Sequence, residues 1–261
     1  TPSSGCSRTS RWPLLNSTSM PWSSESASRP RTATITRAAI SSVSGITATN
    51  KTYDGNDTAT LVTSGATFND MFSGDVLNVA TSSGVFSDAR AAVGKTVSIS
   101  GITLGGADAG NYTLTTSTAS TTATIDPKAL TVTALSQTKV YDSNTSVASS
   151  ALNVGYSVSG LVGSESLSGV TLAYTNANVS RNGGGAVLSD KTIAASTAVA
   201  GASTQLSDYA ISYVNNTAST ITPYVVSLTG TRVYDATTDV AASKLVIGTL
   251  VGSETLTLTG V

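Results

Sequence analysis

The sequence predicts an all-β protein made of tandem, sandwich-like (immunoglobulin-like) modules in an elongated array. From residue 35 onward, apolar and hydroxyl-bearing residues alternate, as in residues 96–100, which is typical of half-buried strands. A Tyr-Asp phrase also recurs once per domain-sized length of chain. No window combines a period of 3.6 residues with helix caps, so helices should be few and short. A β-grasp-like module with one short helix is the alternative fold.

The recurring phrases set the length of the module. The tyrosines of the Tyr-Asp phrase are 88 and then 93 residues apart, at Tyr53, Tyr141 and Tyr234. In a second phrase an acidic residue precedes a leucine by two positions, and the leucines are 90 and then 89 residues apart, at Leu77, Leu167 and Leu256. Because two independent phrases agree on one period, they predict a tandem array.

The module boundaries follow from a third phrase, in which Thr-Ile-x-Pro ends one strand before another begins. Proline fixes φ and removes an amide donor, so Pro127 and Pro223 should each end a sheet. A degenerate copy of this phrase spans residues 33–40. With two or three residues between strands, the modules should be joined stiffly. The predicted organisation is a remnant of a preceding repeat at 35–40, a first module at 41–126, a second module at 127–222 and a truncated third repeat at 223–261.

Residues 1–34 differ from the rest of the chain. They hold both tryptophans, the only cysteine and four of the six prolines, in a mixture of Ser, Arg and Pro without hydrophobic period. Such a composition is typical of a disordered linker. The alternative is that this segment was translated out of frame. Neither interpretation predicts a folded domain.

The composition excludes several function classes. Histidine is absent and Cys6 is the only cysteine, which removes Ser-His-Asp and Cys-His nucleophiles and Cys/His zinc sites. Charged residues are 11% of the chain and the net charge is −1, so there is no basic surface for nucleic acid. No stretch approaches the roughly 18 to 20 apolar residues of a membrane-spanning helix, so no membrane insertion is expected within this segment. We expect no cofactor.

The Tyr-Asp phrase is interpreted as a structural motif. The tyrosine ring should cover one end of a core, and the aspartate should bond its own downstream amides in a turn. The next position is Gly55, Ser143 or Ala236, and because alanine disfavours positive φ we expect an ordinary turn residue there. The residues assigned to this motif are Tyr53, Asp54, Tyr141, Asp142, Tyr234 and Asp235.

Two chemical interpretations of the acidic residues are weaker. Residues 53–57 have a passing likeness to a calcium loop, but Thr145 and Thr238 replace Asp57 in the other copies and the terminal glutamate of such a loop is missing. We therefore expect no metal site. Paired carboxylates for catalysis are also not expected, because the acids of the second phrase occupy one position in successive modules and should be solvated strand edges. These acids are Asp75, Glu165 and Glu254.

Four segments, in the first module and at its boundary with the second, closely resemble the YDG-type repeat of large bacterial surface proteins, namely filamentous-haemagglutinin-like and other repetitive adhesins. These segments are residues 51–59, 93–97, 105–114 and 123–132, and the resemblance extends over about residues 35–261. The second module departs from the pattern, with Ser143 in place of glycine and a weakened phrase at 204–209. The resemblance implies an exported stalk at the bacterial cell surface, built of tandem β modules, with no catalytic residues.

The leading functional hypothesis is therefore a structural spacer of a secreted or cell-surface adhesin, whose partners are neighbouring repeats of the same longer chain. In the alternative, the modules themselves bind host-surface or matrix glycan or protein. An enzyme is a third and weaker hypothesis. Buried tyrosines would favour the spacer, and an exposed aromatic cluster repeated in each module would favour binding.

Overall fold

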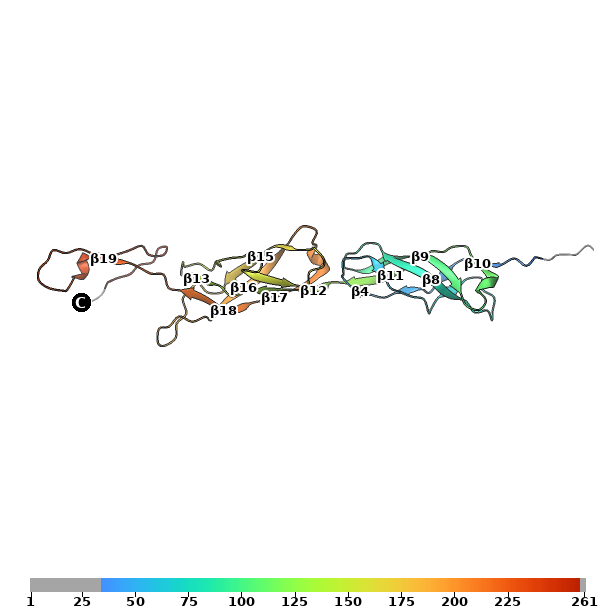
Figure 1. Ribbon diagram of the computed structural model, residues 1–261, viewed down its shortest axis with the longest axis horizontal. Coiled ribbons are helices and arrows are strands. Elements are labelled where there is room, and N and C mark those ends of the chain that lie inside the picture. The colour runs from blue at the N-terminus through green and yellow to red at the C-terminus, as the bar shows by residue number, and fades with distance from the viewer. Residues whose placement is uncertain (1–33, 259–261) are drawn as a thin grey trace, which may run out of the picture. The chain divides into compact units, whose positions relative to one another are not determined.

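The computed structural model describes residues 34–258, and the interpretations of residues 1–33 lie outside the described residues. The chain divides into two units, residues 1–36 and 37–261, and every strand of the described residues lies in the second. Nearly all regular structure of this unit is β, and the helices of the described residues are three 3₁₀ turns of three residues each. This agrees with the predicted all-β class and with the expectation of few, short helices. Figure 1 shows the strands of the first two modules.

The first module contains a five-stranded sheet in the order β4-β11-β9-β8-β5 and three two-stranded pairs, β1-β10, β2-β7 and β3-β6. Its elements are β1 (Ala38–Ile40), β2 (Val43–Ser44), β3 (Thr47–Ala48), β4 (Lys51–Thr52), β5 (Thr58–Ala59), β6 (Leu61–Val62), β7 (Thr67–Phe68), β8 (Asn78–Phe86), β9 (Ala92–Gly105), the 3₁₀ helix η1 (Ala109–Asn111), β10 (Tyr112–Leu114) and β11 (Ala119–Asp126).

The second module contains a three-stranded sheet, β14-β12-β17, and a four-stranded sheet, β13-β18-β16-β15. Its elements are β12 (Lys128–Ala134), β13 (Thr138–Val140), β14 (Tyr156–Ser159), β15 (Leu167–Tyr174), β16 (Lys191–Ala200), the 3₁₀ helix η2 (Leu206–Asp208), β17 (Tyr209–Val214) and β18 (Asn216–Thr222). Residues 223–258, which the sequence predicts to be part of a third repeat, contain β19 (Leu228–Gly230), the 3₁₀ helix η3 (Ala242–Lys244) and β20 (Leu245–Ile247), with β19 and β20 paired antiparallel.

The two modules share one topology. In each, a long antiparallel pair (β8-β9, β15-β16) is followed by the last strand (β11, β18), and the short strand of the Tyr-Asp phrase (β4, β13) pairs parallel to that last strand. The first strand also pairs parallel to the strand after the 3₁₀ turn in both modules, as β1 with β10 and β12 with β17. The weakened phrase at 204–209 therefore keeps the backbone arrangement of its stronger counterpart.

Residues 35–40, which were predicted to be a remnant of a preceding repeat, contain strand β1 of the first module. Ala38 pairs with Tyr112 and Ile40 with Leu114, and Ile40 is fully buried. Residues 38–40 thus supply a strand of the first module, in the position that β12 takes in the second.

The core follows the predicted alternation at most positions. In β9 the side chains of Lys95, Val97 and Ile99 are buried and those between them are exposed, as expected when neighbouring side chains leave opposite faces of a strand. The alternation from residue 35 onward extends to residues 209–213 in the sequence, but there it does not match the burial at its end, since Tyr209 is buried and Tyr213 is 38% exposed.

None of the helices in the described part of the chain is long and apolar enough to cross a membrane.

Ile125 tests the packing of the first module. Its side chain is fully buried in β11, so Ile125→Ala removes buried methyl groups and leaves a cavity. We expect a loss of about 2 to 5 kcal/mol in the free energy of unfolding, measured by denaturant titration of the full chain. The matched control is Val93→Ala in β9, where the side chain is 87% exposed and the change should stay within about 0.5 kcal/mol. Equal effects of the two substitutions would contradict this placement of the core.

Candidate functional site: a tyrosine–carboxylate junction

The Tyr-Asp phrase lies where its module ends. Strand β4 pairs with the last residues of β11, and the amide of Tyr53 donates to the carbonyl of Asp126 over 2.8 Å. Pro127 follows at once and has no amide to continue the ladder, so the chain leaves the sheet there. In the second module the amide of Tyr141 donates to the carbonyl of Thr222 over 2.8 Å, again directly before a proline. The register of a parallel strand pair thus places each tyrosine at the exit of its module.

The predicted aspartate turn is present in all three copies. The Oδ1 atom of Asp54 accepts a hydrogen bond from the amide two residues downstream over 3.1 Å. Asp142 and Asp235 accept the equivalent bonds over 3.2 and 3.1 Å. The turn therefore survives the replacement of the glycine that follows the aspartate.

A cation closes this turn, and it explains the likeness to a calcium loop. The ammonium of Lys51 donates to Asp54 Oδ1 over 2.8 Å, to the Asn56 carbonyl over 2.8 Å and to Asn56 Oδ1 over 2.9 Å. It also lies 5.7 Å from the ring centroid of Phe86. Burial opposes ionisation of Asp54, but the hydrogen bond from Lys51 and that from the Asn56 amide outweigh it, so the pKa of Asp54 is lowered.

The same cation recurs in the other copies. Lys139 pairs with Asp142 over 2.6 Å and lies 5.6 Å from the ring centroid of Tyr174, and Arg232 pairs with Asp235. Sequence reasoning missed this basic residue, although the signal was there: a lysine or arginine stands two positions before each tyrosine of the phrase. Within residues 34–258, no group of three or more His, Cys, Asp or Glu side chains is arranged to hold a metal ion.

The expectation that the residue after the aspartate is an ordinary turn residue is wrong. Gly55, Ser143 and Ala236 have φ of 81°, 62° and 62°, so all three adopt the left-handed region. Glycine adopts it freely, whereas serine and alanine pay strain that the surrounding hydrogen bonds of the turn must offset. A Cβ added at Gly55 would also lie 2.9 Å from Cγ1 of Val162, which belongs to the second module.

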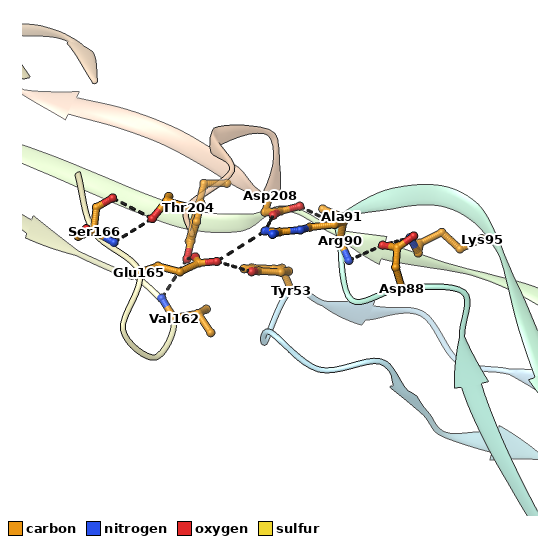
Figure 2. A network of polar contacts seen from close by, with 11 residues as sticks. Tyr53, Asp88, Arg90, Ala91, Lys95, Val162, Glu165, Ser166, Thr204 and Asp208 are labelled. Carbon is orange, nitrogen blue, oxygen red and sulfur yellow. Dashed lines mark hydrogen bonds and ion pairs between the residues drawn. The ribbon is translucent and has the colours of Figure 1, made fainter. Parts of the chain in front are cut away.

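The hydroxyl of Tyr53 reaches across to the second module. It donates to Oε1 of Glu165 over 2.6 Å, while Oε2 of the same carboxylate accepts from the hydroxyl of Tyr209. The rings of the two tyrosines meet edge to face with centroids 5.5 Å apart, and both are buried. Figure 2 shows Tyr53 and Glu165 facing each other across the junction. One carboxylate thus joins a tyrosine of each module.

An ion pair lies beside this carboxylate. The guanidinium of Arg90 donates to Oδ2 of Asp208 over 2.8 Å and lies 3.7 Å from Oε1 of Glu165. The amide of Ala91 donates to Oδ1 of Asp208 over 2.8 Å, so this fully buried carboxylate is bonded at both oxygens. The hydrogen bond to Asp208 raises the pKa of Arg90 further, and the arginine stays charged. Arg90 and Asp208 lie in different modules, so this ion pair is a second contact between the two modules, beside the bond of Tyr53 to Glu165 (Figure 2).

The position of Arg90 is fixed from within its own module. Oδ1 of Asp88 accepts from the amide of Arg90 over 2.7 Å and from the buried ammonium of Lys95 over 2.6 Å. The hydrogen bond from Lys95 lowers the pKa of Asp88. A loop residue that must meet a partner in the next module is thus anchored to strand β9.

The junction recurs between the second module and the third repeat. The hydroxyl of Tyr141 donates to Oε1 of Glu254, and this bond is the main reason that the pKa of Tyr141 is raised. Tyr141 is half-buried, in contrast to Tyr53, and Tyr234 of the third repeat is 85% exposed. The three tyrosines of the motif therefore share a turn but differ in burial.

The expectation of a solvated edge is wrong for Glu165, whose side chain is only 11% exposed. Its carboxylate is a hydrogen-bond acceptor inside the junction. Sequence reasoning placed this acid and Tyr53 on one period but did not connect them, because they lie 112 residues apart. Arg90 and Asp208 were missed altogether, since neither recurs with the period: Asn178 and Asn111 stand at the corresponding places.

The model of the YDG domain matches the chain twice, over residues 36–121 and 126–218. The chain belongs to the YDG domain family. No curated protein and no solved structure gives a significant match. Each of the two YDG domains thus ends close to a junction proline, and the tyrosine named in the motif is the residue that crosses to the next repeat.

The junction can be tested by a double-mutant cycle of Tyr53→Phe and Glu165→Gln in the full chain. Tyr53→Phe removes one hydrogen bond to the charged Glu165, and Glu165→Gln weakens this bond together with the one from Tyr209. Each substitution should therefore lower the free energy of unfolding by about 1 to 3 kcal/mol, measured by denaturant titration. The double variant should lose clearly less than the sum, because both changes remove the same bond. Additive losses would contradict a direct interaction. Asp57→Asn, at an exposed acid of the same turn, is the control and should have little effect.

Because Tyr53 and Tyr209 are buried at the junction, we expect the folded chain to lose stability at alkaline pH. Burial, followed by the hydrogen bond to Glu165, raises the pKa of Tyr209 to about 12 and also raises that of Tyr53. A tyrosine with a raised folded-state pKa contributes its full stabilisation below its unfolded pKa of about 10 and loses it as the pH rises toward the folded value.

We therefore expect the free energy of unfolding to fall between about pH 10 and pH 12, measured by denaturant titration at fixed ionic strength. The variant Tyr53→Phe/Tyr209→Phe should show a shallower fall, because neither ring can ionise. An unchanged slope in that variant would show that other groups cause the alkaline loss.

Proposed function

We propose that this chain is a spacer: YDG modules joined end to end at fixed junctions, as structural repeats of a secreted or cell-surface bacterial adhesin, without catalysis. The observation that carries the proposal is the recurrence of one interlock at two successive junctions. Tyr53 bonds Glu165 of the following module, and Tyr141 bonds Glu254 of the following repeat. A contact that joins each repeat to the next in the same way fixes the length and the direction of the array, which a spacer requires.

The distribution of aromatic side chains supports the same function. Tyr53, Tyr112, Tyr156, Tyr174 and Tyr209 are all at most 6% exposed, so most rings of the two modules serve cores and junctions. We also propose that the second module is a sandwich-like packing of two small sheets. Leu130 and Val132 of one sheet and Ile193 and Ile221 of the other are buried in one cluster.

The test of the spacer is the rigidity of the junction in solution. Spin labels at Val93→Cys and Val199→Cys, both exposed positions, report the distance between the two modules in a full chain carrying Cys6→Ser. We expect one narrow distance distribution, which broadens when Arg90→Ala and Glu165→Gln are added. A broad distribution in the chain without these two changes would overturn the spacer, because modules that swing freely do not set a length.

A second candidate function is ligand binding at the second junction. A hollow of about 520 Å³ lies there, lined by Tyr141, Tyr224, Leu250 and Glu254 among others, whereas the corresponding hollow at the first junction is about 310 Å³. Aromatic rings beside a carboxylate suit a glycan. Saturable binding of one glycan class to the full chain, abolished by Tyr224→Ala and unaffected by Tyr213→Ala, would favour this function over a spacer.

A further inference from the structure

The second module meets the first through an acceptor set of three residues: Val162, Glu165 and Tyr209. The amide of Val162 donates to the hydroxyl of Tyr209 over 2.9 Å, and that hydroxyl donates to Glu165. A turn closes the set, in which the amide of Glu165 donates to the Val162 carbonyl over 3.0 Å. Tyr53 then bonds the remaining oxygen of Glu165 from outside.

The first module contains the same set at its own corresponding end, formed by Phe72, Asp75 and Tyr112. The amide of Phe72 donates to the hydroxyl of Tyr112 over 3.0 Å, and that hydroxyl donates to Asp75 Oδ2 over 2.5 Å. The amide of Asp75 closes the turn on the Phe72 carbonyl over 3.3 Å. Burial, followed by the bond to Asp75, raises the pKa of Tyr112, and burial, followed by the bond to Glu165, raises that of Tyr209.

The two sets differ in what covers them. Within residues 34–258, Oδ1 of Asp75 accepts no hydrogen bond, whereas the equivalent oxygen of Glu165 accepts from Tyr53. Phe72 is 66% exposed and Val76 is 58% exposed. By contrast, Val162, which takes the place of Phe72 in the second module, is partly covered by the first module. An apolar surface with an acceptor at its centre is therefore built in the first module but has no partner among the described residues.

We propose that the end of the first module formed by Phe72, Asp75 and Tyr112 is a docking surface for the tyrosine-bearing end of another YDG module. The incoming tyrosine donates to Asp75 Oδ1, and the turn that follows this tyrosine lies against Phe72, as the turn at Gly55 lies against Val162. The proposal deepens the spacer function, but it rests on the repeated acceptor set and not on adhesion.

The charges beside the proposed docking surface indicate which module end suits it. At the first junction Arg90 meets Asp208, the residue directly before Tyr209. Asn111 stands directly before Tyr112, and Asn178 stands in the second module where Arg90 stands in the first. An asparagine pair needs no buried charge, so the end of the second module, with Tyr141 and Asn178, suits this surface.

The Thr-Ile-x-Pro phrase and its degenerate copy at residues 33–40 define a point at which a copy of the second module can be inserted before the first module. Thr36 stands where Asp126 stands in the phrase, so a copy of residues 127–222 inserted between Thr36 and Arg37 of the full chain keeps the register at both of its ends. We expect hydrogen–deuterium exchange of the amides in residues 71–76 to slow by roughly ten-fold or more relative to the chain without the insert, because docking adds a hydrogen bond to a charged acceptor and covers this turn.

Two matched variants decide whether the slowing comes from the proposed bond. Tyr141→Phe in the inserted copy alone should remove most of it. Tyr53→Phe, which removes the same hydroxyl from the existing junction, should leave it intact. An unchanged exchange rate at residues 71–76 with a folded insert, or slowing that survives Tyr141→Phe in the insert, would overturn the proposal while leaving the Tyr53–Glu165 junction and the spacer untouched.

Folding of the insert is read from peptides of residues 127–222, which should show one protected population. If an unprotected second population shows that the copy does not fold there, a copy of residues 37–126 takes its place. This copy carries Arg90→Asn, which is the residue that the second module has at this position, and is marked by Met71→Leu. Tyr53 of that copy is then the docking residue, and its own Tyr53→Phe should reverse the slowing. The same ten-fold criterion at residues 71–76 of the original module decides for or against the surface.

Discussion

The parallel pairing of the Tyr-Asp strand with the last strand of its module is the constraint on which the junction depends. It ties the amide of Tyr53 to the carbonyl of Asp126, one residue before the proline that ends the sheet. The phenol therefore emerges where the next module begins, and it does so wherever this register is kept. Without that pairing, neither the shared carboxylate nor the neighbouring ion pair would find its partner in the next module.

Burying Glu165 and Asp208 is tolerable because each carboxylate is bonded by donors at both oxygens. The phenols supply hydrogen bonds without adding charge, and Arg90 supplies one positive charge near both acids. Such an arrangement favours one partner in one register, because any other docking would leave a buried carboxylate or hydroxyl unpaired. Apolar contact alone would allow the modules to slide or rotate more freely.

The turn that carries each tyrosine holds the residue after the aspartate at a positive φ, which is a strained conformation in the two copies without glycine. Ser143 and Ala236 adopt the left-handed region at a cost of about 1 to 2 kcal/mol each. The aspartate, the downstream amide and the basic residue two positions before the tyrosine hold this conformation in all three copies. A lysine or arginine thus does what a metal ion does in loops of similar spacing, which is to gather oxygen atoms around one positive charge.

The all-β class, the period of the modules, the junction prolines and the aspartate turn were predictable from sequence, because each depends on neighbours within a few residues or on repetition. The contact of Tyr53 with Glu165 was not, although both lie in recurring phrases, since a period relates equivalent positions and does not say which of them touch. The left-handed φ at Ala236 was hidden because local preference argues against it and the hydrogen bonds of the turn override that preference. Arg90 and Asp208 left no repeated pattern at all. Their pairing was decided only by the tertiary structure, because two polar residues 118 positions apart become partners only when one module is seated on the next.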